Sequence, residues 1–384
     1  MNNCYDFDNP PERRASHSMK WGRVAGRDVL PMWVADMDFA APPPVLAALQ
    51  ESLAHGVMGY SMPWPSLLES IVEALARDHG WQIQPEWIVL IPGVVSGFNL
   101  ACELAGEPGD AVVTLTPVYP PFLSAPGNSA RELIRSDLQR QGERWVCDVD
   151  ALQAQTPAHS RLLMLCNPHN PVGRSYSRAE LQQFAAYAEK NDLLICSDEI
   201  HCGLVLDDSA PHIPLASLDA DTAKRCITLM APSKTWNIPG LSSAFAVISD
   251  ARLRARFKRA AEGILPHTNL LGLVATEAAY RHGEDWRQAL LDYLRGNAAR
   301  VAAAVAEMPG VSSTPVEATY LAWLDCRELA LEHPARFFEA QGVLMSDGRD
   351  FGAPGFLRLN FGCSRSLLDE ALARMRQALA QRRA

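Results

Sequence analysis

The chain has 384 residues, of which 48% are apolar and 21% are charged. This composition is ordinary for a globular protein, and it excludes a largely disordered chain because burial of so much apolar surface offsets the entropy cost of ordering. The net charge is −9 and no extended Lys/Arg-rich run is present, so we expect no nucleic-acid partner. No run approaches about 18 apolar residues, so we expect no membrane span.

Cysteine usage and the first residues indicate a cytoplasmic protein. The segment MNNCYDFDNPPERR is polar and lacks the apolar core of a secretory signal. Cys166, Cys196 and Cys226 lie in apolar runs, so we expect them to be small, reduced core residues. There is no CxxC pair and no histidine pair with convincing metal-ligand spacing, so we predict no metal site.

After an irregular segment over residues 1–43, amphipathic helices are expected at Val45–His55 and Leu67–His79. Short apolar runs then alternate with helical patterns, the clearest of which is Ser177–Lys190 with a capping-box spacing at its start. The basic cluster in residues 252–259 alternates with apolar residues and is interpreted as the solvated face of a helix. The expected strands are Trp87–Ile91, Ala111–Leu115, Arg131–Arg135, Leu162–Cys166, Leu193–Cys196, Cys226–Met230 and Ser243–Ile248.

Continuous apolar strands that alternate with helices predict a parallel α/β sheet covered on both faces. After about residue 280 the pattern changes to a second α+β unit, which we expect to pack with the N-terminal residues. Its elements are a helix at Asp285–Glu307, a strand at Tyr320–Leu324, a helix near Pro334–Gln341, a strand at Phe356–Asn360 and a helix from Ser366. We therefore predict a large domain over 48–280, and a small domain formed by 1–47 together with 281–384.

Chemically unusual residues follow several of the predicted strands, at the edge where an open parallel sheet binds ligands. Pro92–Gly97 leads into a helix and offers backbone N–H groups to an anion. Tyr119 lies between prolines, and the turn over Asn167–Gly173 contains two Asn-Pro pairs. Asp198 and Lys234 each follow a buried strand, where a charge is costly without a partner. Each feature alone also has an ordinary structural interpretation.

Together, these groups match the needs of one small molecule, pyridoxal 5′-phosphate (PLP). The lysine amine forms the Schiff base with its aldehyde. The carboxylate pairs with the protonated pyridine nitrogen and keeps the ring an electron sink. The amide donates to the ring 3-oxygen, the aromatic side chain stacks on the ring, and the helix N-terminus binds the phosphate.

The motifs resemble those of the PLP-dependent aminotransferase superfamily of fold type I, and most closely its cystathionine β-lyase (MalY/PatB-type) branch of C–S lyases. The similar segments run in order along nearly the whole chain: WVADMDF, GYS, PGVVSGFN, TPVYPPF, NPHNPVG, SDEIHCGL, HIPLAS, SKTWNIPGL and FLRLNFG. The resemblance implies an α/β fold with a mainly parallel seven-stranded sheet between helices, plus a smaller α+β domain. It also implies a homodimer with active sites at the subunit interface.

The resemblance further implies roles for the residues around the cofactor ring. Lys234 is the Schiff-base lysine and the proton-transfer base, and Asp198 pairs with the pyridine nitrogen. Asn170 binds the 3-oxygen and also lies at the substrate. His201 lies three positions after the aspartate, among the cofactor contacts, and Tyr119 stacks on the ring as a catalytic residue.

The phosphate and the substrate are assigned in the same way. Val94, Val95 and Ser233 are implied to bind the phosphate, and Tyr60 is implied to reach the phosphate of the neighbouring subunit. Arg358 is implied to bind the substrate α-carboxylate bidentately, a geometry that suits arginine rather than lysine.

Other positions are less clear or depart from the family pattern. Trp33 is either a substrate contact or a packing residue, Asn167 has a structural or carboxylate-side role, and His169 is expected to be an exposed turn residue. Ser242 stands where many aminotransferases carry a phosphate-binding arginine, so the phosphate would depend more on backbone groups and hydroxyls. Gly203 replaces an acid that is frequent in the β-lyase branch.

The resemblance favours α,β-elimination of cystathionine or related cysteine S-conjugates to pyruvate, ammonia and a thiol. The same residues also permit transamination, so a class I/II aminotransferase is the first alternative. A PLP-binding regulatory protein without turnover is the second alternative, although no DNA-binding module is visible.

Overall fold

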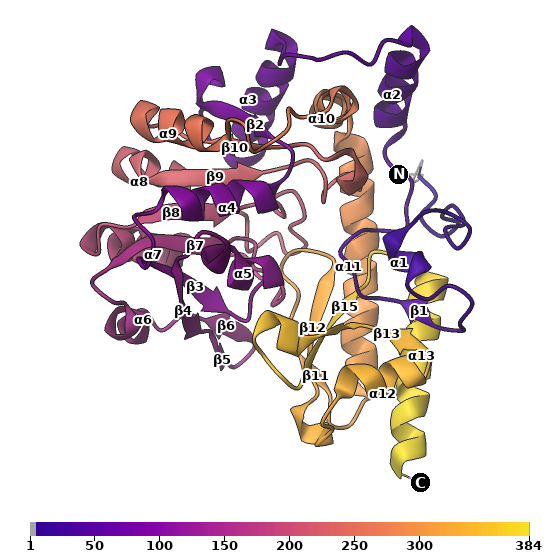
Figure 1. The fold of residues 1–384 in the computed structure, drawn as a ribbon. Helices are drawn as coiled ribbons and strands as arrows, with labels where there is room; N and C mark the ends of the chain where they lie inside the picture. The colour runs from indigo at the N-terminus through magenta and orange to yellow at the C-terminus, as the bar shows by residue number, and fades with distance from the viewer. Residues whose placement is uncertain (1–4, 384) are drawn as a thin grey trace.

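The computed structural model describes residues 5–383, so Cys4 and the first residues of the polar N-terminal segment lie outside the described part. Its main element is a seven-stranded sheet in the order β2-β10-β9-β8-β7-β3-β4 (Figure 1). The strands are β2 (Ile88–Ile91), β10 (Ala244–Val247), β9 (Cys226–Met230), β8 (Leu194–Asp198), β7 (Ser160–Cys166), β3 (Ala111–Thr116) and β4 (Glu132–Asp137). Only β10 runs antiparallel to its neighbours, which confirms the predicted mainly parallel sheet.

Alternate residues of the central strands enter two separate hydrophobic cores, one on each face of the sheet. In β7, Leu163 packs in the core that contains Phe184. Its neighbours Leu162 and Met164 pack in the core that contains Phe98. Both faces are therefore buried under helices, as continuous apolar strands require.

The helices expected at residues 45–55, 67–79, 177–190, 252–259, 285–307 and 334–341 and from residue 366 are present, whereas several shorter ones had not been assigned from the sequence. In chain order they are α1 (Met19–Gly22), α2 (Pro43–His55), α3 (Pro65–His79), α4 (Val94–Leu104), α5 (Pro120–Asn128), α6 (Val149–Gln155), α7 (Arg178–Lys190), α8 (Ala220–Lys224), α9 (Ala251–Ala261), α10 (Leu270–His282), α11 (Glu284–Ala306), α12 (Pro334–Ala340) and α13 (Arg365–Arg383). Both hydrogen bonds of the Ser177–Glu180 capping box are present at the start of α7. In α9, Leu253 and Phe257 are buried while most of the basic side chains are exposed, which confirms the solvated basic face. None of the described helices is long and apolar enough to cross a membrane.

The C-terminal part forms a four-stranded antiparallel sheet in the order β11-β12-β15-β14. Its strands are β11 (Ser312–Ser313), β12 (Leu321–Asp325), β15 (Phe356–Asn360) and β14 (Ser346–Asp347). The N-terminal strand β1 (Leu30–Pro31) pairs in parallel with β13 (Val343–Leu344), so the N-terminal residues pack with the C-terminal part as expected. The domain boundaries themselves stay a prediction. One hairpin, β5 (Gln139–Gln141) with β6 (Arg144–Val146), was not expected because its residues are mostly polar.

Candidate active site

A cavity of about 240 Å³ lies at the carboxyl ends of the central strands. Every cofactor and substrate residue expected from the sequence lines it, except Tyr60 and Trp33. The predicted residues in its lining are Val94, Val95, Tyr119, Asn170, Asp198, His201, Ser233, Lys234 and Arg358. They meet because parallel strands end at the same edge of the sheet.

Asp198, the last residue of β8, is a buried carboxylate in this cavity. Its Oδ1 accepts a hydrogen bond from the Ile200 N–H at 3.1 Å. Burial raises the pKa of Asp198 to about 7, although the Ile200 N–H and the charge of Lys234 act in the opposite direction. A carboxylate in such a place gains from a cationic partner, which is what the protonated pyridine nitrogen of PLP provides.

Lys234 follows β9 and reaches across the cavity to the N-terminal segment. Its Nζ donates a hydrogen bond to the carbonyl oxygen of Ala35 at 2.7 Å. Burial, together with the positive charge of Arg358, lowers the pKa of Lys234 to about 8, while Asp36 and Asp198 oppose this change. A substantial share of this amine is therefore neutral near pH 8, as both a nucleophile and a proton acceptor must be.

Arg358 on β15 is coupled to Asn170 in the same cavity. Its Nη1 donates to Asn170 Oδ1 at 3.0 Å and its Nη2 donates to the carbonyl of Trp33 at 2.9 Å. Its buried Nε has no hydrogen-bond partner, and burial lowers the pKa of Arg358 to about 10. A buried guanidinium with an unused donor suits an anionic ligand such as an α-carboxylate.

The opposite end of the cavity is built from backbone N–H groups and hydroxyls. Helix α4 begins at Val94 with Gly93 as its N-cap, so its first N–H groups have no partner within the helix. Ser233, Ser242 and Ser243 also line the cavity, and the Lys and Arg side chains of its described lining are Lys234 and Arg358 alone. This donor set fits a phosphate bound by amides and hydroxyls, as Ser242 in place of arginine led us to expect.

The structure places His201 and Tyr119 on the remaining walls. His201 is buried with its Nδ1 unpartnered, and burial together with Lys234 and Arg358 lowers its pKa well below the usual range. The Tyr119 N–H donates to the carbonyl of Asn170 at 3.1 Å, and burial and Asp198 raise the pKa of the phenol. Both side chains are therefore neutral at physiological pH. Taken together, the residues that line the cavity offer the groups that pyridoxal 5′-phosphate needs.

One expectation from the sequence was wrong. His169 is not an exposed turn residue but is 1% exposed, and its two ring nitrogens bond to the carbonyl of Pro117 and the hydroxyl of Tyr176. Burial lowers the pKa of His169 to about 4. The turn is covered because the C-terminal part packs over it, with the N–H groups of Glu317 and Ala318 donating to the carbonyl of Gly173.

Tyr60 and Trp33 do not enter the cavity of their own chain. Tyr60 is 100% exposed, so its predicted contact with a neighbour's phosphate stays a prediction. The Trp33 ring lies under the guanidinium of Arg23 and donates to the carbonyl of Lys20, so its substrate contact also stays a prediction. Asn167 bonds to the backbone at two places: its Oδ1 accepts from the nearby Tyr176 N–H, and its Nδ2 donates to the carbonyl of Ile213, 46 residues further along the chain.

Sequence reasoning missed several lining residues. Val34 and Ala35 line the cavity and lie in the segment WVADMDF, which was recognised as a motif although no role was assigned to these two residues. Cys166 is buried as expected but also lines the cavity. It is the last residue of β7 and lies beside Asp198 in the register of the sheet, so its position at a strand end was the available signal.

The comparisons with known proteins agree with this geometry. The family model for aminotransferase class I and II matches residues 27–375. The chain is 37% identical to cystathionine beta-lyase PatB of Bacillus subtilis (strain 168) over 387 residues, with 98% of this chain and 100% of that protein covered.

Two solved structures are similar over almost the full length. The crystal structure of OvoB matches with a TM-score of 0.96 and 46% identity, covering 98% of this chain and 99% of the other. The structure of cystalysin from Treponema denticola, which contains a pyridoxal 5′-phosphate cofactor, matches with a TM-score of 0.94 and 31% identity, with the same coverage. The chain therefore belongs to the aminotransferase class I and II family.

Proposed function

We propose that the protein is a PLP-dependent C–S lyase that cleaves cystathionine or related cysteine S-conjugates to pyruvate, ammonia and a thiol. The observation that carries this proposal is the convergence of Lys234, Asp198 and Arg358 on one cavity. The match along the full length to a protein named cystathionine beta-lyase supports elimination over other reactions of the family.

The chain's own groups suit the start of an elimination. When bound, PLP supplies an electron sink that stabilises negative charge at the substrate Cα. Arg358 holds the α-carboxylate, and its bond to Asn170 Oδ1 turns the Nδ2 donor of Asn170 away from the guanidinium. Lys234 in its neutral form takes the Cα proton. The Cβ–S bond then breaks with its electron pair on sulfur, which leaves as a thiolate and takes a proton.

Transamination remains the alternative, because the same three residues also serve it. The cations of the described cavity lining are Lys234 and Arg358 alone. In this chain, the second carboxylate of a substrate such as glutamate therefore has no cation of its own in the cavity. This charge pattern favours substrates whose distal part is not a simple carboxylate.

The proposal is tested by product analysis with L-cystathionine. We expect pyruvate, ammonia and homocysteine in equal amounts, and borohydride reduction should fix the cofactor on Lys234. The control is Lys234→Ala, which removes both nucleophile and base and should lose about 10³-fold or more in rate. Homocysteine without pyruvate, or fixation of the cofactor on another lysine, would contradict the assignment.

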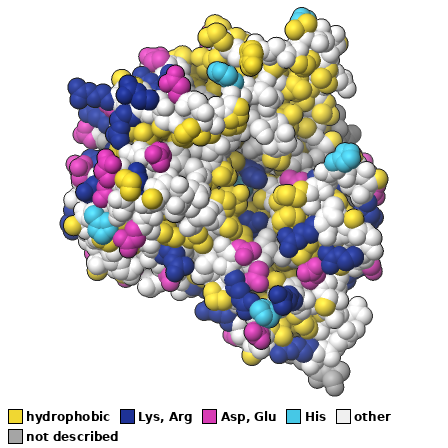
Figure 2. All heavy atoms as spheres, in the orientation of Figure 1, with side chains coloured by type: hydrophobic (Ala, Val, Ile, Leu, Met, Phe, Trp, Pro, Cys, Tyr) yellow, Lys and Arg dark blue, Asp and Glu magenta, His cyan; other side chains and the backbone are white. Residues whose placement is uncertain are grey.

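We also propose that the active form is a homodimer with shared sites. The segment between α2 and α3 is strongly exposed and apolar, with Tyr60 100%, Met62 83% and Val57 63% exposed. Figure 2 shows hydrophobic side chains gathered over the region of α2 and α3. Pro92 lines both the groove beside this segment and the cofactor cavity, and Val95 in the lining of that cavity is exposed as well. A second copy of the chain would cover these residues and bring its Tyr60 to the phosphate end, which lacks a basic side chain.

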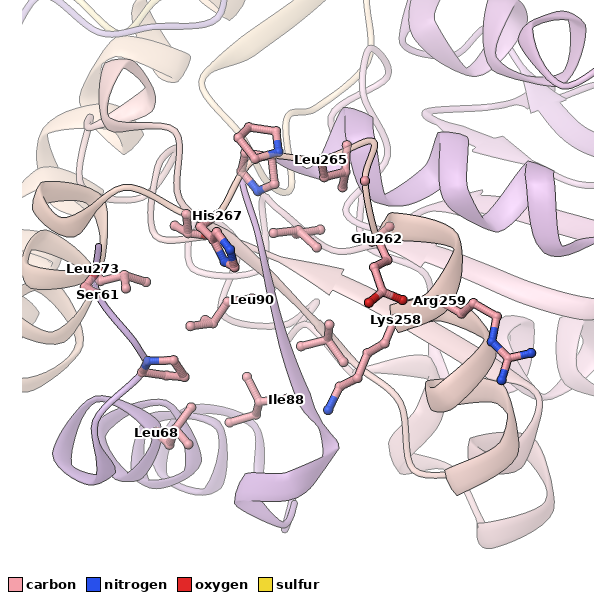
Figure 3. Close-up of a pocket in the computed structure, with 18 of the residues that line it drawn as sticks. Ser61, Leu68, Ile88, Leu90, Lys258, Arg259, Glu262, Leu265, His267 and Leu273 are labelled. Carbon is pink, nitrogen blue, oxygen red and sulfur yellow. The ribbon is translucent and has the colours of Figure 1, made fainter. Parts of the chain in front are cut away.

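A large groove beside this segment supports the same proposal. It has a volume of about 860 Å³ and runs along β2, the edge strand of the main sheet. Figure 3 shows the apolar side chains of Leu68, Ile88 and Leu90 on one side of it, and Lys258 and Glu262 of the α9 region on the other. An apolar groove of this size next to exposed aromatic and thioether side chains is typical of a protein interface.

We place the protein in the cytoplasm as a further proposal. The described cysteines are all free, and most of them are buried. Reduced cysteines in a core are ordinary in the cytosol, where disulfides are rare.

A further inference from the structure

One carbonyl oxygen of the N-terminal segment accepts two hydrogen bonds beside the cofactor cavity. Lys234 Nζ donates to the oxygen of Ala35 at 2.7 Å, and the hydroxyl of Tyr320 donates to the same oxygen at 2.9 Å. Ala35 and Lys234 line the cavity, whereas Tyr320 lies outside its lining and is 1% exposed. The oxygen is therefore reached by the lysine from the cavity and by the tyrosine from the packed interior behind it.

The C-terminal sheet holds this oxygen in place. Nδ2 of Asn360 donates to the carbonyls of residues 34 and 36, on either side of Ala35, and Arg358 donates to the carbonyl of residue 33. Both side chains come from β15, whose end is joined to Tyr320 by the hydrogen bond from the Phe361 N–H to the Tyr320 carbonyl. Tyr320 and the two side chains that bind the backbone of residues 33–36 are therefore held together by direct hydrogen bonds.

The backbone before Tyr320 is strained. Thr319 has a φ of 76°, in the left-handed region that a β-branched residue rarely occupies. Its Oγ1 accepts a hydrogen bond from the Leu321 N–H at 3.1 Å. Such strain persists only where the surroundings over-determine it, and it concentrates at functional sites. The turn places the Tyr320 ring beside His201, with the ring centres 6.2 Å apart, and its hydroxyl on Ala35.

We propose that Tyr320 is a positioning residue that holds the carbonyl oxygen of Ala35 as the docking point for the Lys234 amine whenever that amine is not bonded to the cofactor. The inference rests on the proposed role of Lys234 as the group that takes the Cα proton. An amine that donates one N–H to a fixed oxygen has its lone pair directed elsewhere, which orients it for proton transfer.

The shared acceptor also affects protonation of the lysine. Hydrogen bonding to a carbonyl favours the charged ammonium, and the Tyr320 hydroxyl takes part of the accepting capacity of this oxygen. The other charged or titratable groups that face Lys234 are Arg358, Asp198, Asp36 and His201. Removal of the hydroxyl should therefore raise the pKa of Lys234 while those groups stay in place.

The first test compares Tyr320→Phe with Tyr187→Phe. The control is matched because Tyr187 is also buried, and its hydroxyl bonds to Thr156 outside the cavity. In Tyr320→Phe we expect kcat to fall about tenfold or more, with KM nearly unchanged. The acid limb of the pH profile of kcat should move to higher pH by up to about one unit, because one pKa unit corresponds to about the net free energy of one hydrogen bond. A loss of rate with the limb unmoved would indicate a structural role and overturn the proposal.

The second test needs no turnover. α-Aminoisobutyrate has no Cα hydrogen, and its binding to the holoenzyme can be followed by the visible absorbance of the cofactor. The pH dependence of that binding reports the protonation of the displaced Lys234. Its midpoint should rise in Tyr320→Phe and fall when difluorotyrosine, a stronger donor of the same shape, replaces Tyr320.

Phenylalanine and difluorotyrosine both keep the aromatic ring of Tyr320. The test therefore remains possible even if one of the two variants fails to fold. Equal midpoints in wild type and both variants would overturn the role of Tyr320 while leaving the lyase proposal intact. Absence of pyruvate formation by the wild-type enzyme would instead refute the proposed function, whatever the midpoints are.

Discussion

Two hollows of the molecule, the cofactor cavity and the groove along β2, differ in character. The cofactor cavity is small, about 240 Å³, and its charged side chains have partners within the same chain, such as Asn170 for Arg358 and Ala35 for Lys234. The groove along β2 is larger, about 860 Å³, and it lies next to exposed apolar residues such as Tyr60 and Met62.

The difference shows that the larger of the two hollows is not the one that holds the reactive side chains. Chemistry is concentrated where burial shifts the pKa of Asp198 upward and that of Lys234 downward, because such shifts need a closed site with fixed neighbours. The large groove has an apolar floor, so it suits a protein surface better than a reaction. The comparison predicts that a substitution in the cavity impairs the active site of its own chain, and that a substitution beside the groove impairs the active site of the neighbouring chain.

Among changes that leave Lys234 in place, the largest effect is expected from removing the carboxylate in the cavity. Asp198→Ala takes away the proposed partner of the pyridine nitrogen, and loss of one buried charge pair is worth about 3–5 kcal/mol. We therefore expect the rate of pyruvate formation to fall roughly a hundredfold or more, as measured with saturating substrate and full cofactor loading. Near-normal turnover of the loaded variant would exclude this role.

A mixing experiment tests whether the groove side acts between chains. Tyr60→Ala and Lys234→Ala should each be inactive or weak as pure proteins. After subunit exchange, each mixed dimer has one site with both residues intact, so random pairing should restore about a quarter of the wild-type sites. No recovery after exchange has been verified by mass spectrometry would count against shared sites.

The smallest expected effect concerns stability of the cofactor-free protein. Burial raises the pKa of Asp198 to about 7 in the folded chain, well above its ordinary value of about 4, so ionising this carboxyl group disfavours the folded state. This cost is absent below about pH 4, grows as the pH rises toward 7, and is fully present above 7.

Asp198→Asn removes that cost and keeps the shape of the side chain. The variant should melt several degrees above wild type at pH 8, since each kcal/mol is worth roughly 2–4 °C, and the two should melt together near pH 4. Adding the cofactor should abolish the advantage, because Asp198 then has its partner. Equal melting temperatures at pH 8 without cofactor would show that the carboxylate carries no such cost.

Some parts of the structure could be predicted from the sequence and others could not. Strands such as Leu162–Cys166 were predictable because a short apolar run between two helical patterns is typical of a buried parallel strand. The positions of Asp198 and Lys234 were predictable because the carboxyl ends of parallel strands meet at one edge of the sheet. His169 was misjudged because local turn chemistry does not reveal that the distant segment containing Glu317 and Ala318 covers the turn. The contact of Ala35 with Tyr320 could not be predicted, since a backbone carbonyl carries no side-chain signal and its partner lies 285 positions away in the chain.

The central claim, that this cavity performs elimination, is tested most directly by counting turnovers with L-cystathionine and no added keto acid. The account predicts many pyruvates per active site, with homocysteine in equal amount and a cofactor spectrum that stays unchanged throughout. If instead the keto acid of intact cystathionine forms at one equivalent per site without homocysteine, the cofactor is converted to its amine form, and 2-oxoglutarate restarts the reaction, the protein is an aminotransferase and the lyase proposal is wrong.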